Sequence, residues 1–256
     1  NTLLPLGDSF LARGGDPPVV LPSPSIANVA NAASFASGET APGEWLVITG
    51  SQLGPEAALN VAEGAAPQTS LGNVRVLFDG TAAPLLSVSA ARVVAIAPFA
   101  LAGKESTKVV VEHQGVSSVA VEIPVAPAQP GIVTADGTGR GPAALLDVEG
   151  KALGEGAAEA IVTLTGTGGG VTEPASNDGE VATDAWPPLA QPVSIFIGET
   201  EVEEIFFAGG VAGRAAGFVQ IQFRIPAGVA VGDQPLVVVI GGKSSQSGVT
   251  ITIAEP

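Results

Sequence analysis

The sequence contains no cysteine, no methionine, no tyrosine and a single histidine. The absence of cysteine excludes disulfides and thiolate metal sites, and one imidazole cannot build a site of several histidines. Positive charge is also scarce, because 10 Lys and Arg residues stand against 25 Asp and Glu residues, for a formal net charge of -15. Such a charge repels polyanions such as DNA and RNA. We therefore expect no nucleic-acid partner and predict no cofactor.

Long apolar runs are missing as well. Apolar residues make up 46% of the chain, yet uninterrupted runs such as residues 236–240 are far shorter than the roughly 20 residues of a membrane helix. We therefore expect no membrane insertion. The chain begins with Asn1, without a charged segment followed by an apolar one, which is typical of a mature chain whose leader has been removed. This pattern predicts a secreted protein, extracellular or at the cell surface.

The 34 Gly and 21 Pro residues separate short apolar runs in which β-branched residues are frequent. Alternation of apolar and polar residues between turn signals is typical of strands. The runs that we interpret as strands cover residues 45–49, 74–78, 93–97, 109–112, 119–123, 161–165, 193–197, 219–225, 236–240 and 249–253. Tight hairpin turns are expected at Asp79-Gly80, Gln114-Gly115 and Gly241-Gly242, because Gly readily adopts the positive φ that they require. The predicted fold class is therefore all-β.

The second half of the sequence repeats the first. Val74-Arg-Val-Leu-Phe-Asp-Gly80 corresponds to Val193-Ser-Ile-Phe-Ile-Gly198, and Gly115-Val-Ser-Ser118 corresponds to Gly242-Lys-Ser-Ser245. The segments 44–54 and 160–168, which open the two halves, correspond in the same way. A repeat of this kind predicts two copies of one β-sandwich. The predicted domains are an extended N-terminal arm over residues 1–25 and sandwiches over 26–127 and 128–256, joined near the Pro-rich residues 125–131, which we expect to act as a short hinge.

Several strings carry a family resemblance. They are Asn31-Ala-Ala-Ser-Phe35, Ala41-Pro-Gly-Glu-Trp-Leu-Val-Ile-Thr-Gly-Ser-Gln-Leu-Gly-Pro55, Thr69-Ser-Leu-Gly-Asn-Val-Arg-Val76, Pro130-Gly-Ile-Val-Thr-Ala-Asp-Gly-Thr-Gly-Arg-Gly141 and Gly242-Lys-Ser-Ser245. Together they closely resemble the Solibacter-type C-terminal domain, a family found in large secreted proteins of Acidobacteria. The resemblance covers about residues 26–254. It implies secretion and two tandem immunoglobulin-like (Ig-like) units of the IPT/TIG class, and it brings no established activity with it.

The sequence offers few groups for catalysis. His113 would have to be the base of any Ser-His-Asp triad, but there is no Gly-x-Ser-x-Gly elbow, so we expect a solvated residue at a strand end. Four carboxylates between two strands could supply the pair that glycosidases need; they are Glu199, Glu201, Glu203 and Glu204. Aromatic platforms for a sugar are scarce, with Trp45 and Trp186 the only indoles. We therefore interpret the acidic segment as a solvated hairpin and predict that the chain is not an enzyme.

Two loops could bind small ligands. Asn177-Asp-Gly-Glu180, together with Asp184, offers the oxygen ligands that Ca²⁺ prefers, but it lacks the order of an EF-hand loop, and we predict no metal site. Gly166-Thr-Gly-Gly-Gly170 follows a strand as a phosphate-binding loop would, but no helix and no Lys-Ser/Thr pair follows it. We interpret this segment as a flexible loop between strands.

The first 25 residues contain five prolines and no helical periodicity, so we expect them to be extended. Their large apolar side chains are too numerous for an inert linker; they are Leu3, Leu4, Leu6, Phe10, Leu11, Val19, Val20 and Leu21. In an extended chain Leu4, Leu6 and Phe10 share one face. Either the arm packs on its own first sandwich, or it adds a strand to a neighbouring copy, as in donor-strand complementation of pilins.

The function predicted from these features is that of a secreted, non-enzymatic structural protein. Insertion of each arm into the next copy would be a head-to-tail contact that does not close, which gives a pilus-like filament on the cell surface. The partners would be copies of the same chain, with a glycan or another cell-surface ligand as a further possibility. One alternative is a monomeric module for adhesion or carbohydrate binding, and a minor alternative is a hydrolase.

Overall fold

The computed structural model describes residues 23–181 and 187–255, and within them the chain is built from strands with one short 3₁₀ helix at Phe99–Leu101. The prediction of an all-β fold is confirmed. The eight apolar residues proposed for the arm, from Leu3 to Leu21, lie outside the described residues. The first described strand begins at Ser25, the last residue that the sequence assigned to the arm.

The first half of the chain forms two sheets. Its strands are β1 (Ser25–Asn31), β2 (Trp45–Ser51), β3 (Leu59–Asn60), β4 (Val74–Phe78), β5 (Thr81–Ala82), β6 (Leu85–Val88), β7 (Arg92–Ile96), β8 (Ser106–His113), β9 (Val116–Ser117) and β10 (Val121–Pro124). One sheet has the order β1-β2-β7-β6-β3 and the other the order β10-β8-β4-β5, with β9 paired to β8. The pairs in both sheets are antiparallel.

The second half forms two more sheets. Its strands are β11 (Gly131–Ile132), β12 (Gly141–Pro142), β13 (Leu145–Leu146), β14 (Ala152–Leu153), β15 (Ile161–Thr167), β16 (Val193–Ile197), β17 (Thr200–Glu201), β18 (Ile205–Gly210), β19 (Phe218–Arg224), β20 (Gly232–Ile240), β21 (Lys243–Ser244) and β22 (Val249–Ile253). One sheet has the order β14-β13-β15-β19-β18, with β11 also on β15. The other has the order β12-β22-β20-β16-β17, with β21 paired to β20.

The sequence repeat appears in the order of the strands. Strands β15, β19 and β18 follow one another as β2, β7 and β6 do, and β22, β20, β16 and β17 follow one another as β10, β8, β4 and β5 do. These are the strands that the corresponding strings of the two halves form. Each half therefore places equivalent residues at equivalent positions of its sheets.

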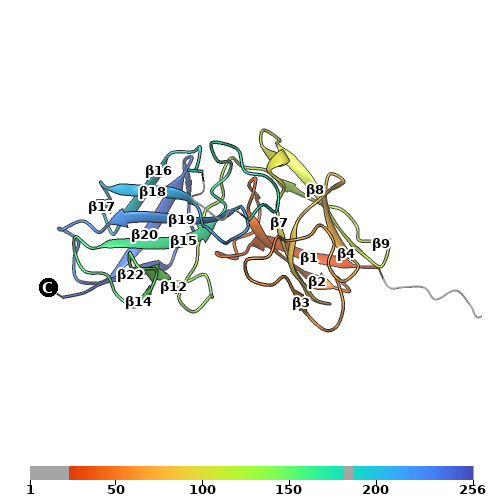
Figure 1. Cartoon of the computed structure of the whole chain (residues 1–256), viewed down its shortest axis with the longest axis horizontal. Coiled ribbons are helices and arrows are strands. Elements are labelled where there is room, and N and C mark those ends of the chain that lie inside the picture. Colours follow the sequence, from red (N-terminus) through yellow and green to blue (C-terminus); the bar gives the residue numbers. More distant parts are fainter. Residues whose placement is uncertain (1–22, 182–186, 256) are drawn as a thin grey trace, which may run out of the picture.

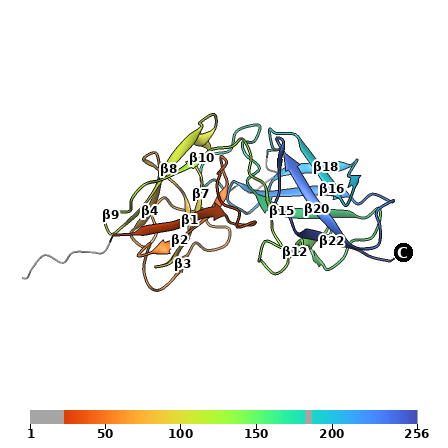
Figure 2. The ribbon, with the colours of Figure 1, turned by 180° about the vertical axis from the view of Figure 1, so that it is seen from behind.

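Each half buries its own hydrophobic core between its two sheets. One cluster of buried side chains is drawn from residues 29–123 and the other from residues 128–253, and Phe78 and Phe223 are among their largest fully buried members. The remaining core residues are mainly Val, Ile, Leu and Ala, which alternate with exposed residues along strands such as β4. Figures 1 and 2 show the two sandwiches end to end along the long axis of the molecule. The domain limits at residues 26, 127 and 128 stay a prediction.

All ten predicted strands are present, and the three predicted turns have the expected conformation. Both residues of Asp79-Gly80, Gln114-Gly115 and Gly241-Gly242 have positive φ, as two-residue turns of type I′ require. Several strand limits were wrong, since β7 ends at Ile96 and β19 at Arg224, each one residue before the predicted end. Val119 was expected inside a strand, but β10 begins at Val121, and Val119 is 86% exposed.

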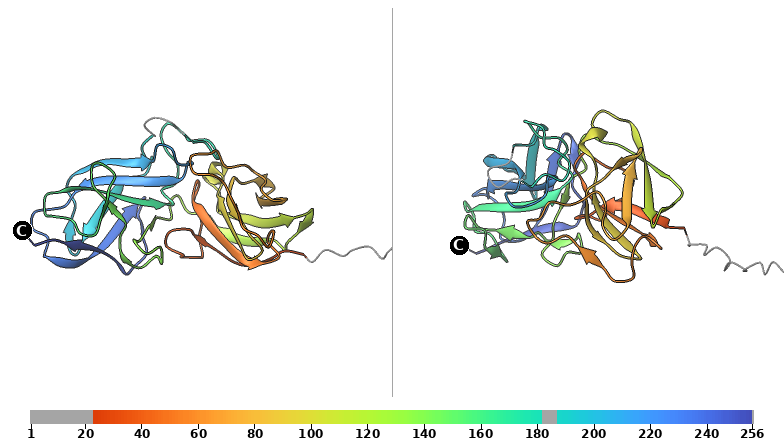
Figure 3. Two further views of the ribbon diagram at one scale, coloured as in Figure 1. Left: turned by 60° about the horizontal axis from the view of Figure 1, so that its bottom comes forward. Right: turned by 45° about the vertical axis from the view of Figure 1, so that its right-hand side comes forward.

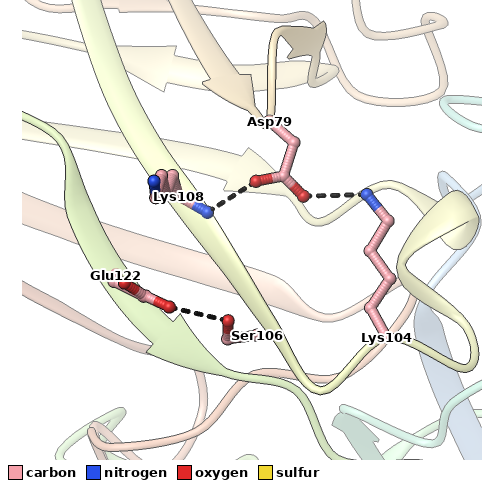
Figure 4. A network of polar contacts seen from close by, with 5 residues as sticks. All are labelled: Asp79, Lys104, Ser106, Lys108 and Glu122. Carbon is pink, nitrogen blue, oxygen red and sulfur yellow. Dashed lines mark hydrogen bonds and ion pairs between the residues drawn. The ribbon is translucent and has the colours of Figure 1, made fainter.

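Asp79 stabilises the turn between β4 and β5 by joining three segments. One of its carboxylate oxygens accepts a hydrogen bond from the backbone N–H of Lys108 at 2.9 Å, and the other lies 2.8 Å from the Nζ atom of Lys104 (Figure 4). The bonds to Lys104 and Lys108 hold the pKa of this carboxyl below its usual value. The ionised form of Asp79 is therefore the one that supports the turn.

We expect the substitution Asp79→Asn to lower the free energy of unfolding by about 0.5 kcal/mol at pH 7, because Asn tolerates positive φ but loses the ion pair. Since the pKa of Asp79 is lowered on folding, its contribution is present above the unfolded-state pKa and is lost as the pH falls through the folded-state pKa. Urea unfolding should give free energies of unfolding for the two proteins that converge as the pH is lowered through the folded-state pKa of Asp79. A difference that does not depend on pH would contradict this role of the charge.

Candidate functional site

The two halves meet at a junction where the linking segment is tied to both of them. The backbone N–H of Thr40 donates to Pro124 O at 3.0 Å, and Ala126 N–H donates back to Thr40 O at 2.8 Å. On the other side, Gln129 N–H donates to Gly168 O at 2.8 Å. The prediction of a hinge at residues 125–131 is therefore wrong, because backbone hydrogen bonds hold this segment against both sandwiches.

The glycine-rich segment 166–170 also belongs to the junction. Its five residues are buried, and a Cβ atom added at Gly168 or Gly170 would overlap the carbonyl oxygen of Gln129 or Pro127, respectively. Both glycines have positive φ. The interpretation as a flexible loop was wrong, because the glycines allow the linker backbone to pack directly on this segment.

A buried polar cluster lies where the first sandwich contacts the linker. Glu44, Asn31 and Thr40 are all 0% exposed. The Glu44 carboxyl accepts hydrogen bonds from the Asn31 Nδ2 atom at 2.8 Å, the Thr40 hydroxyl at 3.0 Å and the Ala41 N–H at 2.7 Å. The Asn31 amide also donates to Gln129 O at 3.0 Å, so the cluster reaches the linker. Because unpaired polar groups are costly to bury, this geometry fixes the linker beside the first sandwich.

Glu44 is a titratable group with an unusual environment. Burial raises the pKa of Glu44 from 4.5 to about 8, and the hydrogen bonds from Ala41, Thr40 and Asn31 oppose this rise. Desolvation has the larger effect because it penalises only the ionised form. In the folded chain Glu44 therefore takes up a proton at a much higher pH than an exposed glutamate does.

We expect Glu44→Gln to remove part of the pH dependence of folding. The unfolded chain binds a proton at Glu44 near pH 4.5 and the folded chain near pH 8, so the contribution of protonated Glu44 to stability is complete below pH 4.5 and is lost as the pH rises to 8. The stability of the unchanged protein relative to the variant should fall across this range, by at most about 1.4 kcal/mol per pH unit. Urea unfolding between pH 4.5 and 8.5 measures it. Glu122→Gln, at an exposed carboxyl, is the matched control, and parallel curves for the unchanged protein and Glu44→Gln would refute the assignment.

Trp45 joins the two sandwiches directly. Its backbone N–H donates to the Thr167 hydroxyl at 2.8 Å, and its indole N–H donates to Ala216 O at 3.2 Å. The Thr167 hydroxyl in turn donates to Gly217 O at 2.8 Å. The indole also packs against the Phe218 ring, with 5.0 Å between the ring centroids. Trp45 therefore fixes the start of β2 in one half to the end of β15 and to the loop between β18 and β19 in the other.

Further contacts lie around this centre. The Asp178 carboxylate accepts the N–H of Phe99 at 2.7 Å, and Lys243 Nζ lies 2.6 Å from a carboxylate oxygen of Glu39. Arg214 pairs with Glu63 at 2.9 Å. Figure 3 shows the same end-to-end contact of the two sandwiches from two more directions. Bonds on several sides of the junction resist both bending and rotation of one half relative to the other.

The residues singled out in the sequence do not converge on a catalytic centre. His113 ends β8, and its Nδ1 atom lies 3.2 Å from Gln52 O. The four glutamates expected in a solvated hairpin are exposed, as predicted, and Glu204 pairs with Arg224 at 2.9 Å. In the loop considered as a calcium site, the Asp178 carboxylate instead accepts the hydrogen bond from Phe99 N–H at the junction. Asp184 lies outside the described residues.

Within residues 23–181 and 187–255, no group of three or more His, Cys, Asp or Glu side chains could hold a metal ion. No helix in this part of the chain is long and apolar enough to cross a membrane.

The sequence analysis did not predict the junction, although several of its residues stand in the strings quoted there. The strings that carry the family resemblance include the junction residues Asn31, Glu44, Trp45, Lys243 and Gly139. At Gly139 an added Cβ atom would lie only 2.9 Å from Ser34 O. The available signal was an Asn and a Glu in apolar surroundings that strand alternation does not explain. A single sequence could not show that these residues meet.

No protein-family model matches the chain, and no curated protein matches it. The Solibacter-type resemblance therefore stays a prediction.

Among solved structures, the chain is similar to SGBP-B from a complex xyloglucan utilization locus in Bacteroides uniformis, at 16% identity over 89% of this chain and 49% of that one, with a TM-score of 0.28. It is similar to SGBP-B of the Bacteroides ovatus mixed-linkage glucan utilization locus, at 13% identity over 91% and 47%, with a TM-score of 0.37. Plexin A4, full extracellular region, matches at 13% identity over 91% and 18%, with a TM-score of 0.31. The chain thus spans about half the length of the two SGBP-B proteins and 18% of the plexin chain. At these TM-scores its function has to be argued from its own residues.

Gly217 offers a direct test of the junction. It has a φ of +92°, and an added Cβ would overlap Gly43 O on the other sandwich. Gly213 in the same loop has a φ of +75° but no atom within 4 Å of its Cβ position. We expect Gly217→Ala to lower stability by about 1–3 kcal/mol more than Gly213→Ala, because the backbone strain is shared and only the first variant overpacks the junction.

Thermal unfolding measures this difference, and small-angle scattering should show a changed arrangement of the two halves for Gly217→Ala alone. Equal effects of the two variants would mean that the close contact of Gly217 with Gly43 does not hold the junction.

Proposed function

We propose that the chain is a non-enzymatic structural subunit outside the cell, which assembles head to tail through residues 1–25. The observation that carries the proposal is the axial layout of the molecule. Strand β1 begins at Ser25, which pairs with Ser51 at the end of the first sandwich away from the junction. The described chain ends at the opposite end of the long axis (Figures 1 and 2). Strand β1 therefore begins at one end of the molecule, where a neighbouring copy would be within reach of residues 1–22.

The fixed junction supports a structural role. A filament subunit has to transmit force from one end to the other, and a loosely linked pair of domains would extend or bend instead. Buried hydrogen bonds around Glu44 and the contacts of Trp45 join the halves without a flexible segment between them. The subunit proposed here is therefore a short, stiff rod made of two Ig-like sandwiches over residues 26–127 and 128–256, of the type that the Solibacter-type resemblance implies.

The arm has the properties of a donor strand. Its large apolar residues need cover, and residues 1–22 could span at most about 80 Å when fully extended. Backbone hydrogen bonds to a sheet edge would fix its register, and Leu4, Leu6 and Phe10 would fill the acceptor from one face. Because the donor and the acceptor are different surfaces, such a contact repeats without closing and gives a filament.

The free end of the second sandwich favours an arm over direct end-to-end stacking. In the correspondence between the two halves, Ala160 and Ile161 take the places of Glu44 and Trp45. This free end therefore lacks the carboxyl and the indole that hold the internal junction. A contact between copies needs another source of affinity, which the apolar arm supplies.

We expect replacement of Leu4, Leu6 and Phe10 by Ser to abolish filaments, because the residues on one face of the donor strand would no longer fill the acceptor. Replacement of Leu3 and Leu11, on the other face, is the matched control and should shorten filaments much less. Negative-stain electron microscopy and analytical ultracentrifugation measure the assemblies.

Removal of residues 1–22 should give a folded monomer, since β1 and both cores remain. Filaments of unchanged length after this removal would exclude the arm as the link between copies. A monomeric full-length protein at high concentration would exclude the filament itself.

A further inference from the structure

A cleft opens beside the junction, on the side where the two sandwiches approach through loops. One wall comes from the loop around residues 61–65 of the first half, and the other from Gly213, Arg214 and Ala215 of the second half. Trp45 and Leu86 also line it. Its volume of about 410 Å³ lies within the roughly 300–1,000 Å³ typical of small-molecule sites.

The cleft combines an aromatic side chain with a charged pair. Trp45 is half-buried and lines the cleft, and an indole offers an apolar, electron-rich surface. The carboxylate of Glu63 and the guanidinium of Arg214 lie 2.9 Å apart, with their side chains 77% and 46% exposed. The guanidinium also lies 5.6 Å from the centroid of the Phe218 ring, which restricts its orientation. Because both side chains are exposed, the carboxylate and the guanidinium can form hydrogen bonds to a ligand without a rearrangement of the protein.

This chemistry fits a sugar better than a peptide. A pyranose presents C–H groups that stack on an aromatic face and hydroxyls that bond to planar charged groups. An extended peptide would need a free strand edge. Beside the cleft the edge of β6 is already occupied, because Val61 N–H donates to Leu86 O at 2.9 Å. The net charge of -15 disfavours acidic polysaccharides.

We propose that the cleft between the 61–65 loop and Arg214 binds a short neutral saccharide, with Trp45 as the stacking surface and the Glu63–Arg214 pair as the hydroxyl partner. The site uses residues from both sandwiches, so it exists only while the junction is intact. It contains no residue of the arm. It is therefore independent of the proposed assembly, and a failure of either proposal leaves the other standing.

The chain offers a sensitive readout because Trp45 and Trp186 are its only indoles. In the full chain carrying Trp186→Phe, tryptophan emission reports on Trp45 alone. We expect titration with cellotetraose, laminaritetraose or mannotetraose to change this emission saturably for at least one of the three, with a dissociation constant on the order of 0.1 mM. Isothermal titration calorimetry of the unchanged chain checks the same binding without any substitution.

The variant Glu63→Gln should raise the dissociation constant at least about tenfold, because a hydrogen bond to a charged group is lost. Glu112→Gln, which alters the exposed Arg75–Glu112 pair elsewhere on the first sandwich, is the matched control and should leave binding unchanged. No saturable signal with any of the three probes, or equal binding by the unchanged chain and Glu63→Gln, would overturn the proposal. Binding of a tetra-alanine peptide in place of the saccharides would overturn it as well.

Discussion

The hydrogen bonds of the buried Glu44 carboxyl are the constraint on which the arrangement of this molecule depends. Glu44 and Asn31 have no contact with solvent, and Asn31 extends the network to the carbonyl of Gln129 in the linker. Because a buried carboxyl without partners would be strongly unfavourable, Asn31 is held beside Glu44, and the Asn31 amide in turn holds the linker through Gln129 O. This polar contact, rather than apolar packing alone, sets where the second sandwich begins.

The junction also gives a physical meaning to the strings that suggested a family. A protein that only had to form two sandwiches would need apolar alternation and turn residues, and many sequences satisfy both. Asn31, Glu44 and Trp45 are not needed for either purpose, yet all three hold the halves together. We infer that these strings specify the relation between the sandwiches. A fixed relation would serve both the proposed subunit and the proposed saccharide site in the cleft shared by the two halves.

Much of the fold could be predicted from the sequence, because local rules determine it. Period-two alternation located strands such as β4 and β16, and Asp79-Gly80 marked a turn that Gly and Asp can adopt. The junction could not be predicted in this way, since its contacts join residues about 100 positions apart, such as Asn31 and Gln129. The glycines of residues 166–170 are ambiguous in the same way. In sequence they resemble a flexible loop, but in the structure they pack so closely against the linker that Gly168 and Gly170 leave no room for a side chain.

The most direct test of a fixed junction uses the absence of cysteine, which allows two spin labels to be placed without background. Val119→Cys and Val148→Cys put one label on each sandwich, at side chains that are 86% and 66% exposed. Double electron–electron resonance then gives the distribution of distances between them. A fixed junction predicts one narrow distribution, no wider than the motion of the labels. A broad distribution, or several distances, would show that the two sandwiches move independently and would contradict the account.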